Sequence, residues 1–212
     1  MNQQTQAGPA SDEPMELPRK LIFIDLETTG VNQISDRITE IGIVCVEQGV
    51  VERWSTLVNP ELPIPPFIEQ LTGISNDMVR DAPLFATLAQ TLAARLDGGL
   101  FIAHNARFDS GFLRSTLEAA GLTLHNDILC TVKLSRKLYP QHAKHNLDSL
   151  TSRHGLQPQG RHRALADADL IWQFWQTVQA EIAPEIFAAA LAKVLRLHHS
   201  PQVPSELGAC RK

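Results

Sequence analysis

Asp25 and Glu27 form the first of three acidic segments in this sequence whose residue types could bind metal ions. They follow an unbroken apolar run, residues 21–24, which is typical of a central β-strand. Alternate residues of a strand lie on one face about 6.6–7 Å apart, so these two carboxylates repel each other and lose solvation. Divalent cations would compensate, and oxygen ligands favour Mg²⁺ or Mn²⁺ over zinc. The alternative is an ordinary pair of surface acids at a strand end.

The second segment, residues 104–109, directly follows another apolar strand. Asp109 falls in the first turn of the helix expected after that strand, where the helix dipole alone would favour an acid. A metal-binding and a purely structural role are therefore both open for Asp109. Asn105 is expected to cap the helix, and Phe108 is expected to lie in the core.

The third segment, residues 162–169, leads into a long helix in which spacing separates two acids. Asp167 is in line with three apolar residues at intervals of four, three and four, namely Ile171, Phe174 and Val178. Asp167 therefore extends a buried stripe and needs a partner there. Asp169 shares a polar face with Gln173, which predicts a solvated acid. His162 precedes the helix, where a histidine is more often a surface residue than a catalytic one.

Together the three segments resemble the motifs of the DnaQ-like DEDDh exonuclease family, which includes the proofreading epsilon subunit of bacterial DNA polymerase III. The matching residues are Asp25-Leu26-Glu27-Thr28-Thr29-Gly30, His104-Asn105-Ala106-Arg107-Phe108-Asp109, and His162 with Asp167 five positions later. The segment Leu71-Thr72-Gly73-Ile74 also looks like the family's loop beside the terminal nucleotide. The resemblance covers approximately residues 19–180.

The resemblance implies a ribonuclease-H-like α/β fold, with a mixed five-stranded sheet, the first three strands antiparallel, and helices on both faces. It implies a 3′-to-5′ exonuclease that releases nucleoside monophosphates from a DNA 3′ end, in proofreading or repair. Two divalent cations, Mg²⁺ or Mn²⁺, would be held by Asp25, Glu27, Asp109 and Asp167. His162 would accept a proton from the attacking water. The implied substrate contacts are Thr29, Leu71, Thr72 and Asn105.

The charge of the chain is distributed unevenly, although the net value of −4 does not itself favour nucleic-acid binding. Residues 1–99 carry 6 basic and 14 acidic side chains, whereas residues 100–163 carry 9 basic and 4 acidic ones. A basic segment beside an acidic one fits an enzyme that holds phosphates and cations on different sides. The basic residues considered for the phosphates are Arg107, Lys133, Arg161 and Arg163. A chance distribution of surface charges, without a function, is an equally open explanation of this pattern.

We expect a disordered leader over residues 1–18, a nuclease domain over 19–180, and a C-terminal helix with a loose tail over 181–212. Hydrophobic patterning predicts a hairpin of strands 38–46 and 50–58, then a proline-rich loop, and further strands at 99–103 and 127–130. The predicted helices cover residues 83–96, 105–120, 132–138, 147–154 and 164–180, with a last one beginning at Pro184. That last helix has a broad apolar face, which either packs on the nuclease or docks a partner.

Several alternatives remain open at this point. The same constellation also serves RNA-trimming exoribonucleases, and a non-catalytic docking subunit could keep the fold. Partners would be single-stranded or frayed DNA 3′ ends, with a DNA polymerase subunit or a further repair domain as further options. Three widely spaced cysteines fit a reducing cytosol, and no apolar run of ~18 residues predicts a membrane span. A cytoplasmic location is therefore expected.

Overall fold

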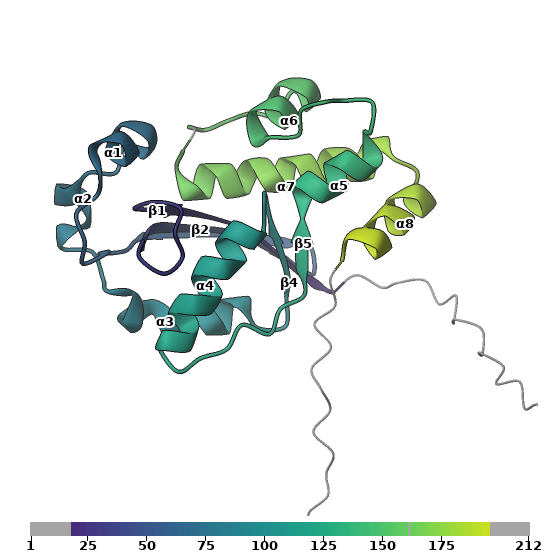
Figure 1. Cartoon of the computed structure of the whole chain (residues 1–212). Helices are drawn as coiled ribbons and strands as arrows, with labels where there is room; N and C mark the ends of the chain where they lie inside the picture. The colour runs from purple at the N-terminus through teal and green to yellow at the C-terminus, as the bar shows by residue number, and fades with distance from the viewer. Residues whose placement is uncertain (1–17, 161, 196–212) are drawn as a thin grey trace, which may run out of the picture.

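The structure, a computed structural model, describes residues 18–160 and 162–195. Its centre is one five-stranded sheet with the order β3-β2-β1-β4-β5 (Figure 1). The strands are β1 (Lys20–Thr28), β2 (Ile38–Glu47), β3 (Val50–Leu57), β4 (Leu100–Ala103) and β5 (Ile128–Cys130). β1 pairs antiparallel with β2 and parallel with β4, so the first three strands are antiparallel and the sheet is mixed. The expected sheet is confirmed.

The hairpin between β2 and β3 turns on two residues. Gln48 and Gly49 both have positive φ angles, 51° and 82°, which is the backbone that a tight hairpin turn requires. Glycine adopts this conformation without a steric penalty, and Gly49 does so here, which closes the predicted hairpin.

Helices cover both faces of the sheet because β1 is apolar on both of its faces. Ile22 and Ile24 face α3 (Phe85–Leu96) and α4 (Arg107–Ala119), while Phe23 lies in the cluster on the opposite face. That opposite cluster includes residues of α5 (Thr131–Leu138), α6 (Leu147–His154) and α7 (Ala164–Glu181). The sheet is therefore the middle of three layers, and every helix predicted between residues 83 and 181 is present within two residues of its predicted bounds.

The proline-rich loop expected after β3 is present, but it leads into two helices that were not predicted. These are α1 (Pro66–Thr72) and α2 (Asn76–Arg80). Pro66 occupies the first helical position, where its missing N–H is not needed and its fixed φ favours a helix. Ile68 and Val79 belong to a small separate core that holds this unit together.

The C-terminal helix, α8 (Pro184–Val194), packs on the nuclease body. The ring of Phe187 lies edge-on to Trp175 of α7, with the centroids 5.1 Å apart. Ile186 is 57% exposed, so only part of the expected apolar face is covered. The apolar face expected from the sequence extends as far as Leu197, which lies outside the described residues. Within the described chain, no helix is both long and apolar enough to cross a membrane.

Candidate active site

Three carboxylates from distant parts of the chain meet at one end of β1. Oxygen atoms of Asp25, Glu27 and Asp167 all lie within 4.8 Å of one another. β1 presents the first two on the same face, and Asp167 comes from the first turn of α7. Such a group of oxygen donors fits a divalent cation, which would also relieve the repulsion between the three charges.

Asp167 is buried, with 6% of its surface exposed, whereas Asp25 and Glu27 are half-buried. The residues predicted to continue its stripe, Ile171 and Phe174, are fully buried in the core below. The periodicity argument for Asp167 is confirmed, since the helix that buries those two residues also carries this acid to the sheet edge.

Asp109 lies beside the three carboxylates but is not part of the close group. It sits in the first turn of α4 and is 2% exposed. Burial raises the pKa of Asp109 to about 7, while hydrogen bonds from its own backbone and from that of Leu26 act in the opposite direction. Because Leu26 separates Asp25 from Glu27 in β1, this hydrogen bond places Asp109 against the same end of the strand.

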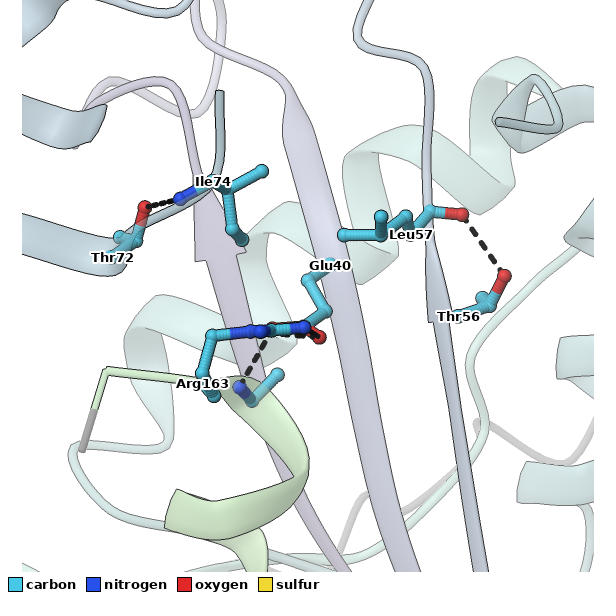
Figure 2. A network of polar contacts seen from close by, with 7 residues as sticks. Glu40, Thr56, Leu57, Thr72, Ile74 and Arg163 are labelled. Carbon is cyan, nitrogen blue, oxygen red and sulfur yellow. Dashed lines mark hydrogen bonds and ion pairs between the residues drawn. The ribbon is translucent and has the colours of Figure 1, made fainter. Parts of the chain in front are cut away.

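An ion pair fixes the start of α7 to the sheet. Glu40 of β2 is 4% exposed and accepts hydrogen bonds from Arg163, the two shortest running from Nη2 to Oε1 (2.7 Å) and from Nε to Oε2 (3.0 Å) (Figure 2). Oε2 of Glu40 also accepts from the backbone N–H of Ala164, the first residue of the helix, at 3.0 Å. Glu40 pairs directly with Glu27 across β1 and β2. The pair thus positions the helix that carries Asp167 next to the strand that carries Glu27.

Gly42 lets the same helix approach the sheet closely. It is the register partner of Asp25, and a side-chain carbon added to it would overlap the backbone of Ala164 and Leu165. Only glycine leaves room for the backbone of α7 at this distance. Glu40 and Gly42 are alternate residues of β2 and lie on the same face of the strand. On that face, Glu40 binds the start of α7 and Gly42 leaves room for its backbone.

Sequence reasoning did not single out Glu40 or Gly42, although a signal was present. An acid within the apolar run Ile38–Val46 must be buried in a strand of that kind, and a buried acid requires a partner. The identity of that partner, 123 residues away, depends on the fold.

His162 lies two residues before α7, is partly exposed, and has a φ of 58°. It is not one of the three grouped metal-binding side chains among the described residues. The structure therefore places it at the base of the helix that carries Asp167, and its role as proton acceptor stays a prediction.

The four expected substrate contacts have different surroundings. The Thr29 hydroxyl accepts a hydrogen bond from the backbone of Arg37. The buried Thr72 hydroxyl donates to the carbonyl of Ile68 and accepts from the backbone N–H of Ile74, the second of which is drawn in Figure 2. These hydroxyls therefore anchor the chain on which they lie. Leu71 is 52% exposed at the end of α1, and Asn105 is exposed in the loop before α4.

Two expectations about this region were wrong. Asn105 does not cap α4, because the N-cap position is Ala106 and Asn105 itself has a left-handed φ of 66°. Asp169 is not a solvated acid, because its side chain is 14% exposed and lies 2.8 Å from Arg53 of β3. Its predicted neighbour Gln173 does share its face and donates a hydrogen bond to it at 2.8 Å.

The four basic residues considered for phosphates also differ. Arg163 is committed to Glu40 and holds the helix to the sheet. Arg107 and Lys133 are exposed. Arg161 lies outside the described residues.

Comparison with known families and proteins agrees with this geometry. Residues 22–173 match the model of a family described as exonuclease, and this range includes all five residues predicted to be catalytic. The chain is 39% identical over 153 residues to the PolC-type DNA polymerase III of Caldanaerobacter subterraneus subsp. tengcongensis. It is 41% identical over 155 residues to the 3′-5′ exonuclease DinG of Bacillus subtilis. Each match covers 72% of this chain, but only 11% and 17% of the respective relatives.

Solved structures of two exonucleases have the same fold. Exonuclease X in complex with 5′-overhanging duplex DNA superposes with a TM-score of 0.63 at 28% identity, covering 80% of this chain and 98% of that one. Exonuclease I from E. coli in complex with a dA16 oligonucleotide gives a TM-score of 0.71 at 18% identity, covering 80% of this chain and 42% of that one. The second likeness concerns the fold alone.

Proposed function

Because the chain belongs to the exonuclease family that its residues 22–173 match, we propose that it is a metal-dependent 3′-to-5′ exonuclease acting on DNA. The observation that supports this most directly is the meeting of Asp25, Glu27 and Asp167 within 4.8 Å. Grouped carboxylates repel one another and lower the stability of the fold. Such a cluster therefore favours a function in which bound cations act on a phosphodiester.

In this proposal, Asp25, Glu27 and Asp167 hold divalent metal, Mg²⁺ or Mn²⁺, and Asp109 serves a second ion of the same kind from beside them. Metal bound there supplies charge stabilisation for the oxygens that attack and leave phosphorus. The carboxylate oxygens fit such ions, and the cluster contains no sulfur ligand that would favour zinc.

The protein's own side chains would orient the substrate and move the proton. A ring nitrogen of His162 would take the proton from the attacking water, as a general base does. The 3′-terminal nucleotide would lie between the acidic cluster and α1, where Leu71 offers an exposed apolar surface and Thr72 holds the chain. Asn105 and Thr29 would complete the contacts to this nucleotide.

DNA is the preferred substrate class because similar proteins are named as DNA polymerases, and because the similar structures hold DNA. By this likeness we propose action on single-stranded or frayed 3′ ends during replication or repair in the cytoplasm. A polymerase subunit or a further repair domain would be its partner. The chain spans only 10 to 17% of the length of its curated relatives, and those relatives' other activities are not assigned to it.

The proposal is tested with matched DNA and RNA oligonucleotides in Mg²⁺, in Mn²⁺ and in chelator. We expect mononucleotide release from DNA that requires metal and that Asp25→Ala abolishes. Preferential degradation of RNA would assign the protein to the RNA-trimming alternative. No hydrolysis of either polymer with metal present would leave only a docking role.

A further inference from the structure

A groove of about 610 Å³ lies next to the proposed active site and has positively charged walls. It is bounded by the loop before α4, by α4 itself, by β5 and α5, and by the end of α8. Three of its lining residues are cations, namely Arg107, Arg114 and Lys133, and no residue that lines the groove is an acid. A polyanion is therefore the class of ligand that its charge would attract.

The groove shares one residue with the proposed site. Asn105, a proposed substrate contact, lines it, and Arg107 lies only two residues before Asp109 in the first turn of α4. Residues two apart on a helix point to different sides. Asp109 therefore reaches β1 and the acidic cluster, while Arg107 lines the groove on the other side of the same turn.

Helix stability gives no reason for two of these cations. Arg107 is the first residue of α4, and Lys133 is the third residue of α5. Positive charges are unfavourable at helix N-termini because the helix dipole is positive there. α5 has no acid in its first turn to offset Lys133. Two unfavourable positions that converge on one groove point to a ligand that uses both charges.

Internal ion pairs also do not account for them. Neither Arg107 nor Lys133 takes part in the ion pairs found among the described residues, which belong to other cations such as Arg53, Arg95 and Arg163. Arg107 and Lys133 are exposed, so both can reach a bound molecule.

We propose that this groove receives the phosphates of the substrate strand upstream of the linkage that is cut, as a single strand. This inference rests on the proposed exonuclease function and extends it by naming the path of the strand. No aromatic side chain lines the groove, so bases are not stacked there and binding is independent of sequence. The charged path would make longer strands better substrates than very short ones.

Binding tests the path without catalysis. The affinity of a fluorescent single-stranded DNA of ~20 nucleotides is measured by anisotropy in chelator over a range of salt concentrations, for wild type and for Arg107→Gln/Lys133→Gln. For single strands, the slope of log affinity against log salt changes by about 0.7 per phosphate contact, so the double variant should lose roughly 1.4 from it. Lys144→Gln, which removes an exposed lysine from a loop outside the groove, is the matched control and should keep the wild-type slope.

The dependence of hydrolysis on the length of the DNA strand tests the same path. The ratio of kcat/KM for the 20-mer to kcat/KM for a trinucleotide should fall roughly tenfold in the double variant and stay unchanged in Lys144→Gln. An unchanged slope together with an unchanged ratio overturns the inference, and so does a loss confined to duplex DNA. If no substrate is cut but the salt slope falls as expected, the groove is a nucleic-acid site and it is the exonuclease proposal that fails.

Discussion

Arg163 and Glu40 form a two-pronged ion pair, 2.7 and 3.0 Å long, that ties the first turn of α7 to β2. Arg163 lies four residues before Asp167, and Glu40 is the cross-strand partner of Glu27 in the neighbouring strand. The pair therefore connects the two elements whose carboxylates must meet. Its main effect should be on the geometry of the acidic cluster.

Arg163→Ala should lower kcat by about tenfold to a hundredfold, because small displacements of a catalytic group cost that much. It should lower the free energy of unfolding by about 1–3 kcal/mol, since buried Glu40 loses a charged partner. KM should change much less than kcat. Steady-state kinetics and urea unfolding measure these quantities.

Arg53→Ala is the matched control for this variant. Arg53 also pairs with an acid of α7, and its side chain is 46% exposed, compared with 45% for Arg163. It should lose some stability but keep kcat, because its partner, Asp169, is not in the acidic cluster. Equal losses of kcat in both variants would mean that α7 is not positioned by its first turn.

Asp167→Ala and Asp169→Ala separate the two acids of α7. The first should reduce hydrolysis by orders of magnitude and remove a site for Mn²⁺, because Asp167 belongs to the grouped carboxylates. The second should leave hydrolysis intact and cost stability, because it breaks the pair with Arg53. Calorimetric titration with Mn²⁺ and thermal unfolding distinguish these effects. If Asp169→Ala abolishes hydrolysis in a folded protein, the assignment of the helix faces is wrong.

Asp109 should make the metal-free protein less stable as the pH rises. Its pKa is about 7 in the folded protein and 3.8 in the reference state, so the folded state binds the proton more tightly. The free energy of unfolding therefore falls between about pH 4 and pH 7. Asp109→Asn removes this penalty.

In chelator, Asp109→Asn should raise Tm at pH 8 by at least about 2–4 °C, equivalent to about 1 kcal/mol, and change it little at pH 5. Thermal unfolding at the two pH values measures the difference. A variant that is destabilised equally at both would indicate that Asp109 is held as a neutral hydrogen-bonding residue.

His162→Ala should lower kcat by roughly 10²–10⁴ if the histidine takes the proton from water. Its affinity for Mn²⁺ should stay close to that of wild type. Loss of Mn²⁺ binding in this variant would instead make His162 a metal ligand.

The apolar runs predicted the sheet and the main helices because their lengths and periods are properties of the local sequence. Asp167 was placed correctly for the same reason, since its helical neighbours Ile171 and Phe174 are buried. α1 was missed because several prolines near Pro66 indicated a loop, although proline is also favoured at a first helical position.

The remaining errors arose from tertiary contacts. Asp169 lies on a polar helix face, but β3 passes beside it and supplies Arg53. The close approach of α7 to Gly42 likewise depends on a distant chain segment. A single sequence does not specify such partners, so these features became visible only with the fold.

The most direct test of the central claim follows a 5′-labelled single-stranded DNA over time with Mg²⁺ or Mn²⁺. A 3′-to-5′ exonuclease shortens the labelled strand one nucleotide at a time, which gives a descending ladder, and a blunt duplex of the same sequence is degraded more slowly. The ladder should be absent in chelator and in Asp25→Ala/Glu27→Ala. Immediate release of the labelled nucleotide, or cutting of closed circular DNA, would contradict the account.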